Sequence, residues 1–163
     1  MTHEVLRAVA MLGATVTTGL VAGVFVLYAH TVMPGLRRTD DRTFVAAFAA
    51  LDRAILNPWF LVGGFLGAPV LTVAAAAAEA GEPSFWWVLA ALALHLVSVG
   101  VTVAVHLPLN DALKAAEASD PAPVRRDFRE ARWVRWNLLR AASSTSALTC
   151  LGWALVLLGR STG

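Results

Sequence analysis

Residues 84–107 read SFWWVLAALALHLVSVGVTVAVHL. The stretch contains no Asp, Glu, Lys or Arg, and about 20 apolar residues in a helix are enough to cross the hydrocarbon core of a membrane. It opens with Phe85, Trp86 and Trp87, aromatic residues of the kind that favour the membrane interface. The stretch therefore predicts a membrane-spanning helix, and the rest of the chain is interpreted around it.

Three further apolar stretches predict helices of the same kind. They cover residues 8–32, 54–78 and 137–158. Of the 163 residues in the chain, 58% are hydrophobic and only 15% are charged, which is too apolar for an ordinary soluble domain. We therefore predict an all-α fold, a bundle of four transmembrane helices that forms a single domain over residues 1–163.

Polar, partly helical connectors link these spans. The first connector contains a predicted interfacial helix over residues 40–53, which has an apolar side. That side comprises Phe44, Val45, Phe48 and Leu51. The second connector contains a predicted basic helix over residues 124–136, which leads into the fourth span because no strong helix breaker separates the two.

Prolines are predicted to end or bend three of the spans. Pro34 and Pro108 follow the first and third spans, and a proline cannot continue helical hydrogen bonding. Pro69 lies within the second span and predicts a kink near the middle of the membrane.

Basic residues are concentrated in and beside the two connectors. Of the 13 Lys and Arg residues, 11 lie there, and the other two are Arg7 and Arg160. The positive-inside rule then predicts an integral protein of the cell membrane with cytoplasmic connectors and with both termini outside the cytoplasm. The charge pattern reflects topology, so we expect no nucleic-acid partner.

Polar side chains are predicted to gather at the cytoplasmic, connector end. In the third span, four polar residues at spacings of three, four and four share one helix face. They are His95, Ser98, Thr102 and His106. Polar groups are costly in lipid, so this face should look into the bundle, either onto a cavity or ligand or into hydrogen bonds between helices. Other polar residues predicted at the same end are His30, Asn57, Asn110, Asn137 and Arg140, and Trp133 shares a helix face with the last two.

These residue types favour proton chemistry in an apolar pocket. His30 or His106 would act as the catalytic base, and the amides together with Arg140 would stabilise the developing anion. His95 and His106 lie about 16 Å apart along one helix and cannot share an ion. His30 with His106, as ligands of a metal or a haem, remains an alternative. The single cysteine, Cys150, allows neither an intramolecular disulfide nor a Cys-based zinc motif, and we expect no cofactor.

Four short segments, taken in order, carry a family resemblance. They are HTVMPGL at 30–36, AILNPWF at 54–60, LPLND at 107–111 and WVRWNLLR at 133–140. Together they resemble the anthrone oxygenase-like family of small four-helix membrane proteins, and the resemblance covers almost the whole chain. It matches the family's polar positions to Asn110, Trp136, Asn137 and Arg140, whereas Asp52 stands where relatives often carry an asparagine.

The resemblance implies an activity. Some fungal members of that family are similar to enzymes that oxidise anthrones to anthraquinones with molecular oxygen and without a metal or flavin. This chain would then be a cofactor-independent oxygenase acting on an apolar aromatic or quinol-like substrate. The alternative is a non-enzymatic membrane protein that binds a lipid or another apolar small molecule, or that assists a membrane partner. Gly19 and Gly23 serve either internal packing or contacts in a homo-oligomer.

Overall fold

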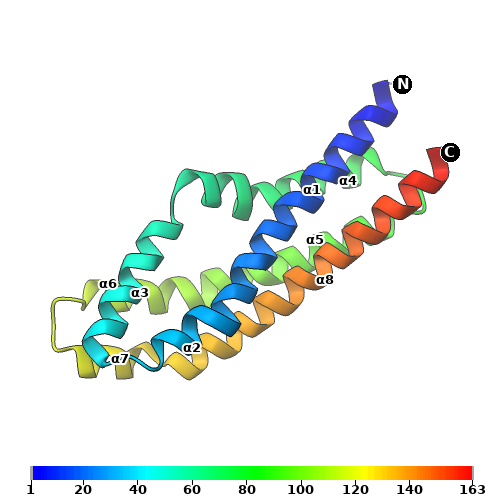
Figure 1. The fold of residues 1–163 in the computed structure, drawn as a ribbon. Coiled ribbons are helices and arrows are strands. Elements are labelled where there is room, and N and C mark those ends of the chain that lie inside the picture. The colour runs from blue at the N-terminus through cyan, green and yellow to red at the C-terminus, as the bar shows by residue number, and fades with distance from the viewer. Residues whose placement is uncertain (1, 163) are drawn as a thin grey trace.

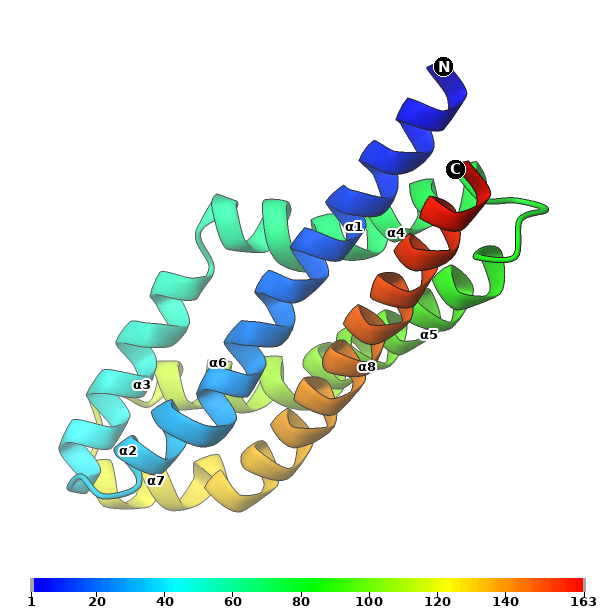
Figure 2. The same ribbon diagram turned by 45° about the vertical axis from the view of Figure 1, so that its right-hand side comes forward.

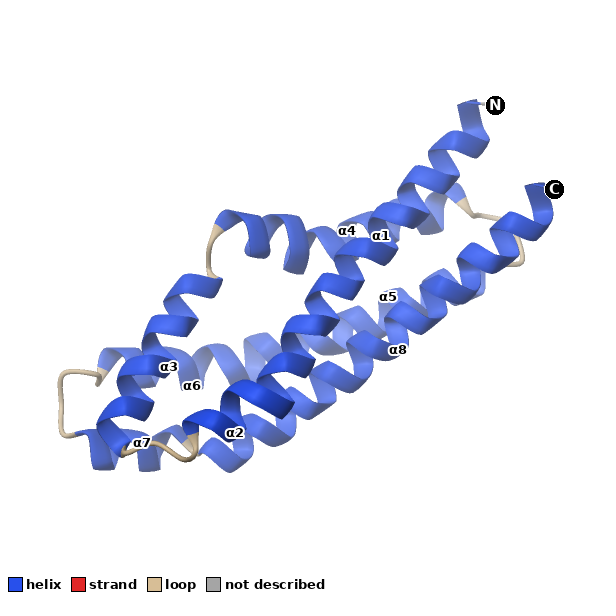
Figure 3. Ribbon diagram, in the orientation of Figure 1, coloured by secondary structure: helices blue, strands red, loops and turns tan. Residues whose placement is uncertain are grey.

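The computed structural model describes residues 2–162 as an elongated bundle of helices joined by short loops (Figure 1 and Figure 3). Four helical rods in this range are long and apolar enough to cross a membrane. They are His3–Leu36, Trp59–Ala78, Phe85–Ala115 and Glu130–Arg160. The predicted all-α class with four transmembrane helices is confirmed.

Three of the four rods combine α-helical and π-helical segments. The first consists of α1 (Thr2–Leu27), the π-helical segment η1 (Tyr28–Val32) and α2 (Met33–Leu36). The second consists of η2 (Trp59–Leu66) and α4 (Gly67–Ala78), and the third of α5 (Phe85–Val101), η3 (Thr102–His106) and α6 (Leu107–Ala115). The fourth rod is α8 (Glu130–Thr162). The connectors hold α3 (Asp41–Ile55) and α7 (Pro121–Phe128).

Pro34 and Pro108 do not end their helices, contrary to the sequence prediction. Each lies just inside an α-helix that directly follows a π-helical segment, and Pro69 of α4 follows η2 in the same way. At the end of η1, the Met33 amide bonds to the Tyr28 carbonyl five residues back. This wider turn relieves the clash between a proline ring and the carbonyl four residues before it. The first and third rods therefore run beyond their predicted ends.

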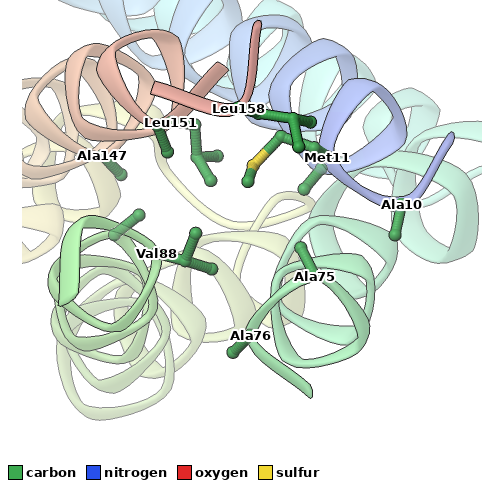
Figure 4. Close-up of a cluster of buried hydrophobic side chains, with 11 residues drawn as sticks. Ala10, Met11, Ala75, Ala76, Val88, Ala147, Leu151 and Leu158 are labelled. Carbon is green, nitrogen blue, oxygen red and sulfur yellow. The ribbon is translucent and has the colours of Figure 1, made fainter. Parts of the chain in front are cut away.

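The end of the bundle that carries both termini is packed with small side chains. The N- and C-termini lie at the same end in both views, opposite α2, α3 and α7 (Figure 1 and Figure 2). Alanines dominate the core there, and they allow helix backbones to approach closely. The core residues are Ala10, Met11, Ala14, Ala75, Ala76, Val88, Ala91, Ala147, Leu151, Ala154 and Leu158, drawn from α1, α4, α5 and α8 (Figure 4).

A buried ion pair closes this terminal end. The Arg7 guanidinium donates hydrogen bonds of 2.7 and 3.0 Å to the two carboxylate oxygens of Glu79, at the end of α4. The Ser84 hydroxyl also donates to Glu79, and Glu82 pairs with Arg7 at 3.2 Å. The hydrogen bonds from Arg7 hold the pKa of Glu79 below its ordinary value. Arg7 is therefore matched by carboxylates of the protein itself.

The connector end has a second core, which is aromatic. The predicted interfacial helix exists as α3, but its phenylalanines face inward instead of lying against the membrane interface. Phe44 and Phe48 are fully buried and contact the ring of Phe128 from α7, and Phe48 also contacts Trp133 of α8. Leu51 is exposed. The connectors thus form a packed cap on the bundle.

The predicted continuous passage from the basic helix into the fourth span is interrupted. Arg129 adopts a left-handed conformation with φ of 54° and separates α7 from α8. On one continuous helix, Phe128 and Trp133 would point about 140° apart. The break brings their rings to 6.4 Å, so both enter the aromatic core. Core packing therefore outweighs the helical propensity of the segment.

Candidate functional site

An apolar cavity of about 150 Å³ lies at the connector end of the bundle. Its walls come from α1, η1, α3, η2, η3, α6 and α8. Aromatic rings contribute much of the lining, namely those of Phe25, Tyr28, Phe48, Phe60, Phe65 and Trp133. A dry apolar cavity of about this size accommodates a benzene ring. The cavity is therefore suited to an aromatic group.

The cavity has a mouth on the apolar outer surface of the bundle. Leu56, Val103 and Leu107 line the cavity and are also exposed, Val103 to 58%. These side chains belong to or adjoin rods that are apolar enough to lie in a membrane. The lining of the cavity is therefore continuous with the apolar outer surface of the bundle.

Arg140 brings a positive charge to the wall of the cavity. The residue is only 7% exposed. Its guanidinium donates to the Asn137 side-chain oxygen at 2.8 Å and to the Thr102 hydroxyl at 3.2 Å, and it lies 4.3 Å from the centre of the Phe25 ring. Within residues 2–162, no carboxylate forms an ion pair with it, and its Nε is the one buried side-chain polar atom found without a hydrogen-bond partner. Burying a cation without an anion is costly, so the arrangement favours an anionic or electron-rich ligand.

Asn137 holds Arg140 in place. Its amide nitrogen donates to the Phe25 carbonyl of α1 at 3.0 Å, while its amide oxygen accepts from Arg140. Asn137 is fully buried, and both ends of its side chain are used. The amide therefore ties the Arg140 side chain of α8 to the backbone of α1.

A second polar group enters the cavity from α3. Asp52 lines the cavity and accepts a hydrogen bond of 2.6 Å from the Asn110 amide, and its other oxygen lies 2.7 Å from the Lys114 ammonium. The Trp133 indole N–H donates to the Asn110 oxygen at 2.9 Å. An indole N–H can only donate, so Asn110 must accept with its oxygen and donate with its nitrogen. Asp52 therefore accepts the hydrogen bond from the Asn110 amide.

His106 lies in the cavity wall in an unusual setting. It is almost fully buried, and its ring packs edge-on against Trp133 with 4.8 Å between centroids. Its Nδ1 lies 3.4 Å from the Val101 carbonyl oxygen and its Nε2 lies 3.3 Å from the Trp133 carbonyl oxygen. Both ring nitrogens thus face backbone acceptors. In the described part of the chain, no group of three His, Cys, Asp or Glu residues could hold one metal ion.

The polar stripe of the third span faces the bundle interior and divides into two parts. Near mid-span, His95 and the Thr18 hydroxyl share a hydrogen bond of 2.9 Å, and Ser98 lies 3.3 Å from Ser144. These residues serve contacts between helices. Nearer the connector end, Thr102 and His106 line the cavity. One half of the stripe therefore forms hydrogen bonds between helices, and the other half faces the cavity.

The structure brings together five of the residues predicted for the site. His106, Asn110, Trp133 and Arg140 line the cavity, and Asn137 lies directly behind Arg140. They come from η3, α6 and α8. Polar residues of α8 and of the third rod therefore lie at the same cavity in the structure.

The other three predicted residues are not among those that line the cavity. His30 is exposed and hydrogen-bonds its neighbour Thr31 at 2.6 Å. Asn57 is exposed and caps its own turn, accepting from the Phe60 amide at 2.9 Å. Trp136 is 38% exposed. The structure therefore places His30, Asn57 and Trp136 outside the cavity lining.

Sequence reasoning did not place Asp52 in the site, although a signal was present. Phe44, Phe48 and Asp52 follow one another at steps of four on α3, so they share a helix face. Phe44 and Phe48 are buried, and Asp52 continues that face to the rim of the cavity. An acidic residue on the apolar face of an amphipathic helix is the signal that could have identified it.

The fold and the cavity together define a class of protein, a four-helix membrane bundle with an aromatic-lined pocket and an unpaired buried arginine. The chain belongs to the anthrone oxygenase family, because the model of that family matches residues 54–150, more than half of the chain. The match includes Asn110, Trp133 and Arg140 but begins just after Asp52. Searches of curated proteins and of solved structures returned no significant match.

Proposed function

We propose that the protein is a membrane oxygenase that oxidises an apolar aromatic or quinol-like substrate with molecular oxygen in this cavity. The observation that carries the proposal is the Arg140 guanidinium, which is buried at the wall of an aromatic-lined cavity and forms no ion pair with a carboxylate of residues 2–162. Family membership supports the reaction class.

The chemistry needs an anion of the substrate. Oxidising a ring methylene to a carbonyl removes four electrons, and one dioxygen molecule accepts them, giving the carbonyl oxygen and one water. A carbon acid reacts with oxygen only after it has lost a proton, as an enolate or phenolate-like anion. A fixed positive donor in a water-poor cavity stabilises such an anion more strongly than water does. Arg140, held by Asn137, would have this role.

The cavity is proposed to open toward the cytoplasmic half of the cell membrane. The connector end carries most of the basic residues, which favour the cytoplasmic side. Both termini lie at the opposite end and would be outside the cytoplasm. A reporter enzyme that is active only outside the cytoplasm, fused to the C-terminus, would test this orientation. An inactive fusion would reverse it.

Oxygen uptake with anthrone as the probe tests the activity. The purified protein in phosphatidylcholine vesicles should consume oxygen faster than vesicles alone, and with ¹⁸O₂ the product should gain one ¹⁸O atom. Val103→Trp should block the mouth of the cavity and bring uptake close to that of the vesicles. Val97→Trp is the matched control, because Val97 is an exposed valine of the same rod that does not line the cavity.

Equal uptake by wild type, Val103→Trp and empty vesicles would overturn the proposal. Under that outcome, a stoichiometric lipid or a stoichiometric protein partner recovered with the purified protein would favour the non-enzymatic alternative.

A further inference from the structure

Building on the proposed function, we infer that Asp52 is the catalytic base of the oxygenase reaction. Asp52 takes the proton, and Arg140 binds the oxygen that becomes negative. The inference rests on the positions of these two groups in one cavity and on the contacts of His106.

His106 is poorly arranged to accept a proton from a ligand. A neutral imidazole has one N–H and one lone pair, and only the nitrogen with the lone pair can act as a base. Both ring nitrogens of His106 face backbone carbonyl oxygens, those of Val101 and Trp133, at 3.4 and 3.3 Å. The lone pair therefore points into the protein, and His106 forms the wall of the cavity without acting as the base.

Asp52, unlike His106, has acceptor positions that remain available for a proton. Each carboxylate oxygen receives one donor, Asn110 on one side and Lys114 on the other. A carboxylate accepts about four hydrogen bonds, so about two acceptor positions remain. The side chain lines the cavity and is 12% exposed.

Arg140 is the second charged residue that lines the same cavity. Its guanidinium belongs to α8, whereas Asp52 belongs to α3, so the two charged groups reach the cavity from different helices. Trp133 lies between the two polar groups, because its indole N–H bonds to Asn110 while its ring lies 5.6 Å from the Arg140 guanidinium carbon.

The step balances without an oxidant. The C–H bond breaks, its proton goes to an oxygen of Asp52, and the electron pair forms a carbon–carbon double bond. The carbonyl oxygen takes the negative charge and accepts the hydrogen bond from Arg140. Dioxygen reacts afterwards with the enolate, in the oxidation proposed above.

Deuterium exchange without oxygen isolates this step. Anthrone is incubated in D₂O with protein in phosphatidylcholine vesicles under argon, and deuterium at its methylene carbon is measured by mass spectrometry. Wild-type protein should accelerate exchange over vesicles alone, and Asp52→Asn should reduce the acceleration about 100-fold, as expected for loss of a general base. Asp52→Glu keeps a carboxylate and should retain part of the acceleration.

The matched control is Asp111→Asn. Asp111 also contacts Lys114, at 3.0 Å, but its side chain is 68% exposed and it does not line the cavity. Its exchange rate should stay near that of wild type. Binding of anthraquinone, which has no acidic methylene, should persist in Asp52→Asn and shows that the variant is folded. If Asp52→Asn does not fold, Asp52→Ala is compared with Asp111→Asn instead, and a rate for Asp52→Ala equal to that of Asp111→Asn would overturn the assignment.

The outcomes separate the two proposals. Exchange that depends on Asp52, without oxygen uptake, would support the base and overturn the oxygenase. Oxygen uptake with unchanged exchange in Asp52→Asn would support the oxygenase and overturn Asp52 as the base.

Discussion

The protein buries one arginine near each end of its bundle, and the two arginines differ in whether a carboxylate contacts them. Arg7, at the terminal end, makes two hydrogen bonds to Glu79 and a further ion pair to Glu82. Arg140, at the connector end, is held by the neutral groups of Asn137 and Thr102 and keeps its Nε–H free. The charge of Arg7 is compensated within the protein, whereas that of Arg140 is not compensated by direct contact with an acid.

The difference indicates what each end is for. The terminal end has regular α-helices, an alanine-rich core and a matched ion pair, all of which serve packing. The connector end has three π-helical segments, a cavity and an unmatched cation. π-Helical segments often occur at functional sites, because they turn side chains away from the positions of a regular helix. We therefore expect stability to depend mainly on the terminal end and activity on the connector end.

Replacing Arg7 with methionine should have the largest effect on stability. The substitution leaves the Glu79 carboxylate buried without its partner, which costs about 3–5 kcal/mol in the free energy of unfolding. The measurement is an SDS titration of the protein in micelles, followed by circular dichroism. Arg160→Met, at an exposed arginine near the C-terminus, is the control. Equal stability of the two variants would remove the structural role given to Arg7.

Replacing Arg140 with methionine should have the largest effect on activity. Loss of the donor that stabilises the anion should lower the rate of oxygen uptake about 10²–10³-fold. Stability should change little, because removal of a buried cation that no acid contacts offsets the cost of about 1–3 kcal/mol of leaving the buried Asn137 oxygen without its donor. A variant that keeps full activity but loses as much stability as Arg7→Met would show that the two arginines are alike.

Trp133→Phe tests the link between the aromatic core and Asp52. It leaves the Asn110 oxygen without its donor, which should cost about 1–3 kcal/mol and lower the rate by misplacing the Asn110 amide that bonds Asp52. Trp136→Phe, at an exposed tryptophan one turn further along α8, should change neither property. If both variants behave alike, the hydrogen bond to Asn110 does not matter.

Gly67→Ala tests whether the π-helical shape of η2 is required. A Cβ at Gly67 would lie 2.9 Å from the Val62 carbonyl oxygen, so the backbone must shift at a cost of about 1–3 kcal/mol. Gly63→Ala is the matched control, since its Cβ would meet nothing within 4 Å and alanine favours helices over glycine by about 0.5–1 kcal/mol. Opposite signs for the two substitutions are expected in the same SDS titration.

Acid should weaken the terminal end first. The hydrogen bonds from Arg7 lower the pKa of Glu79 below its ordinary value of 4.5. The stability that comes from this pair is therefore fully present above pH 4.5 and is lost as the pH falls through the lower pKa of the folded protein. Glu79→Gln should abolish this part of the pH dependence. An identical loss of stability in acid for wild type and Glu79→Gln would exclude Glu79 as its source.

Apolar run length predicted the four spans, because the hydrocarbon core sets a minimum length that the sequence either meets or fails. Proline patterns predicted the helix ends less well. The rule that proline ends a helix assumes α-helical geometry throughout, and the turns before Pro34, Pro69 and Pro108 are π-helical. That change depends on the packing around each turn, which a single sequence does not show.

The site was predicted best where a helix carries polar residues. The stripe that includes Ser98 and His106 had one reasonable orientation, because polar groups avoid lipid. α1 is apolar on nearly every side, so its pattern could not identify the packed face. We predicted that the helix face with Gly23 and His30 packs against the other helices. In the structure, Thr18 and Phe25 are buried, and they mark a different face.

The unmatched positive charge of Arg140 also offers a route to the natural substrate. An anionic or electron-rich compound that binds beside this guanidinium in the cavity stabilises the folded state. Ligand binding raises stability by mass action, by about 2.7 kcal/mol at 100 times the dissociation constant. A library of aromatic ketones and phenols could therefore be ranked by the rise in melting temperature of the wild-type protein, with Arg140→Met as the reference. Such a screen requires no knowledge of the reaction.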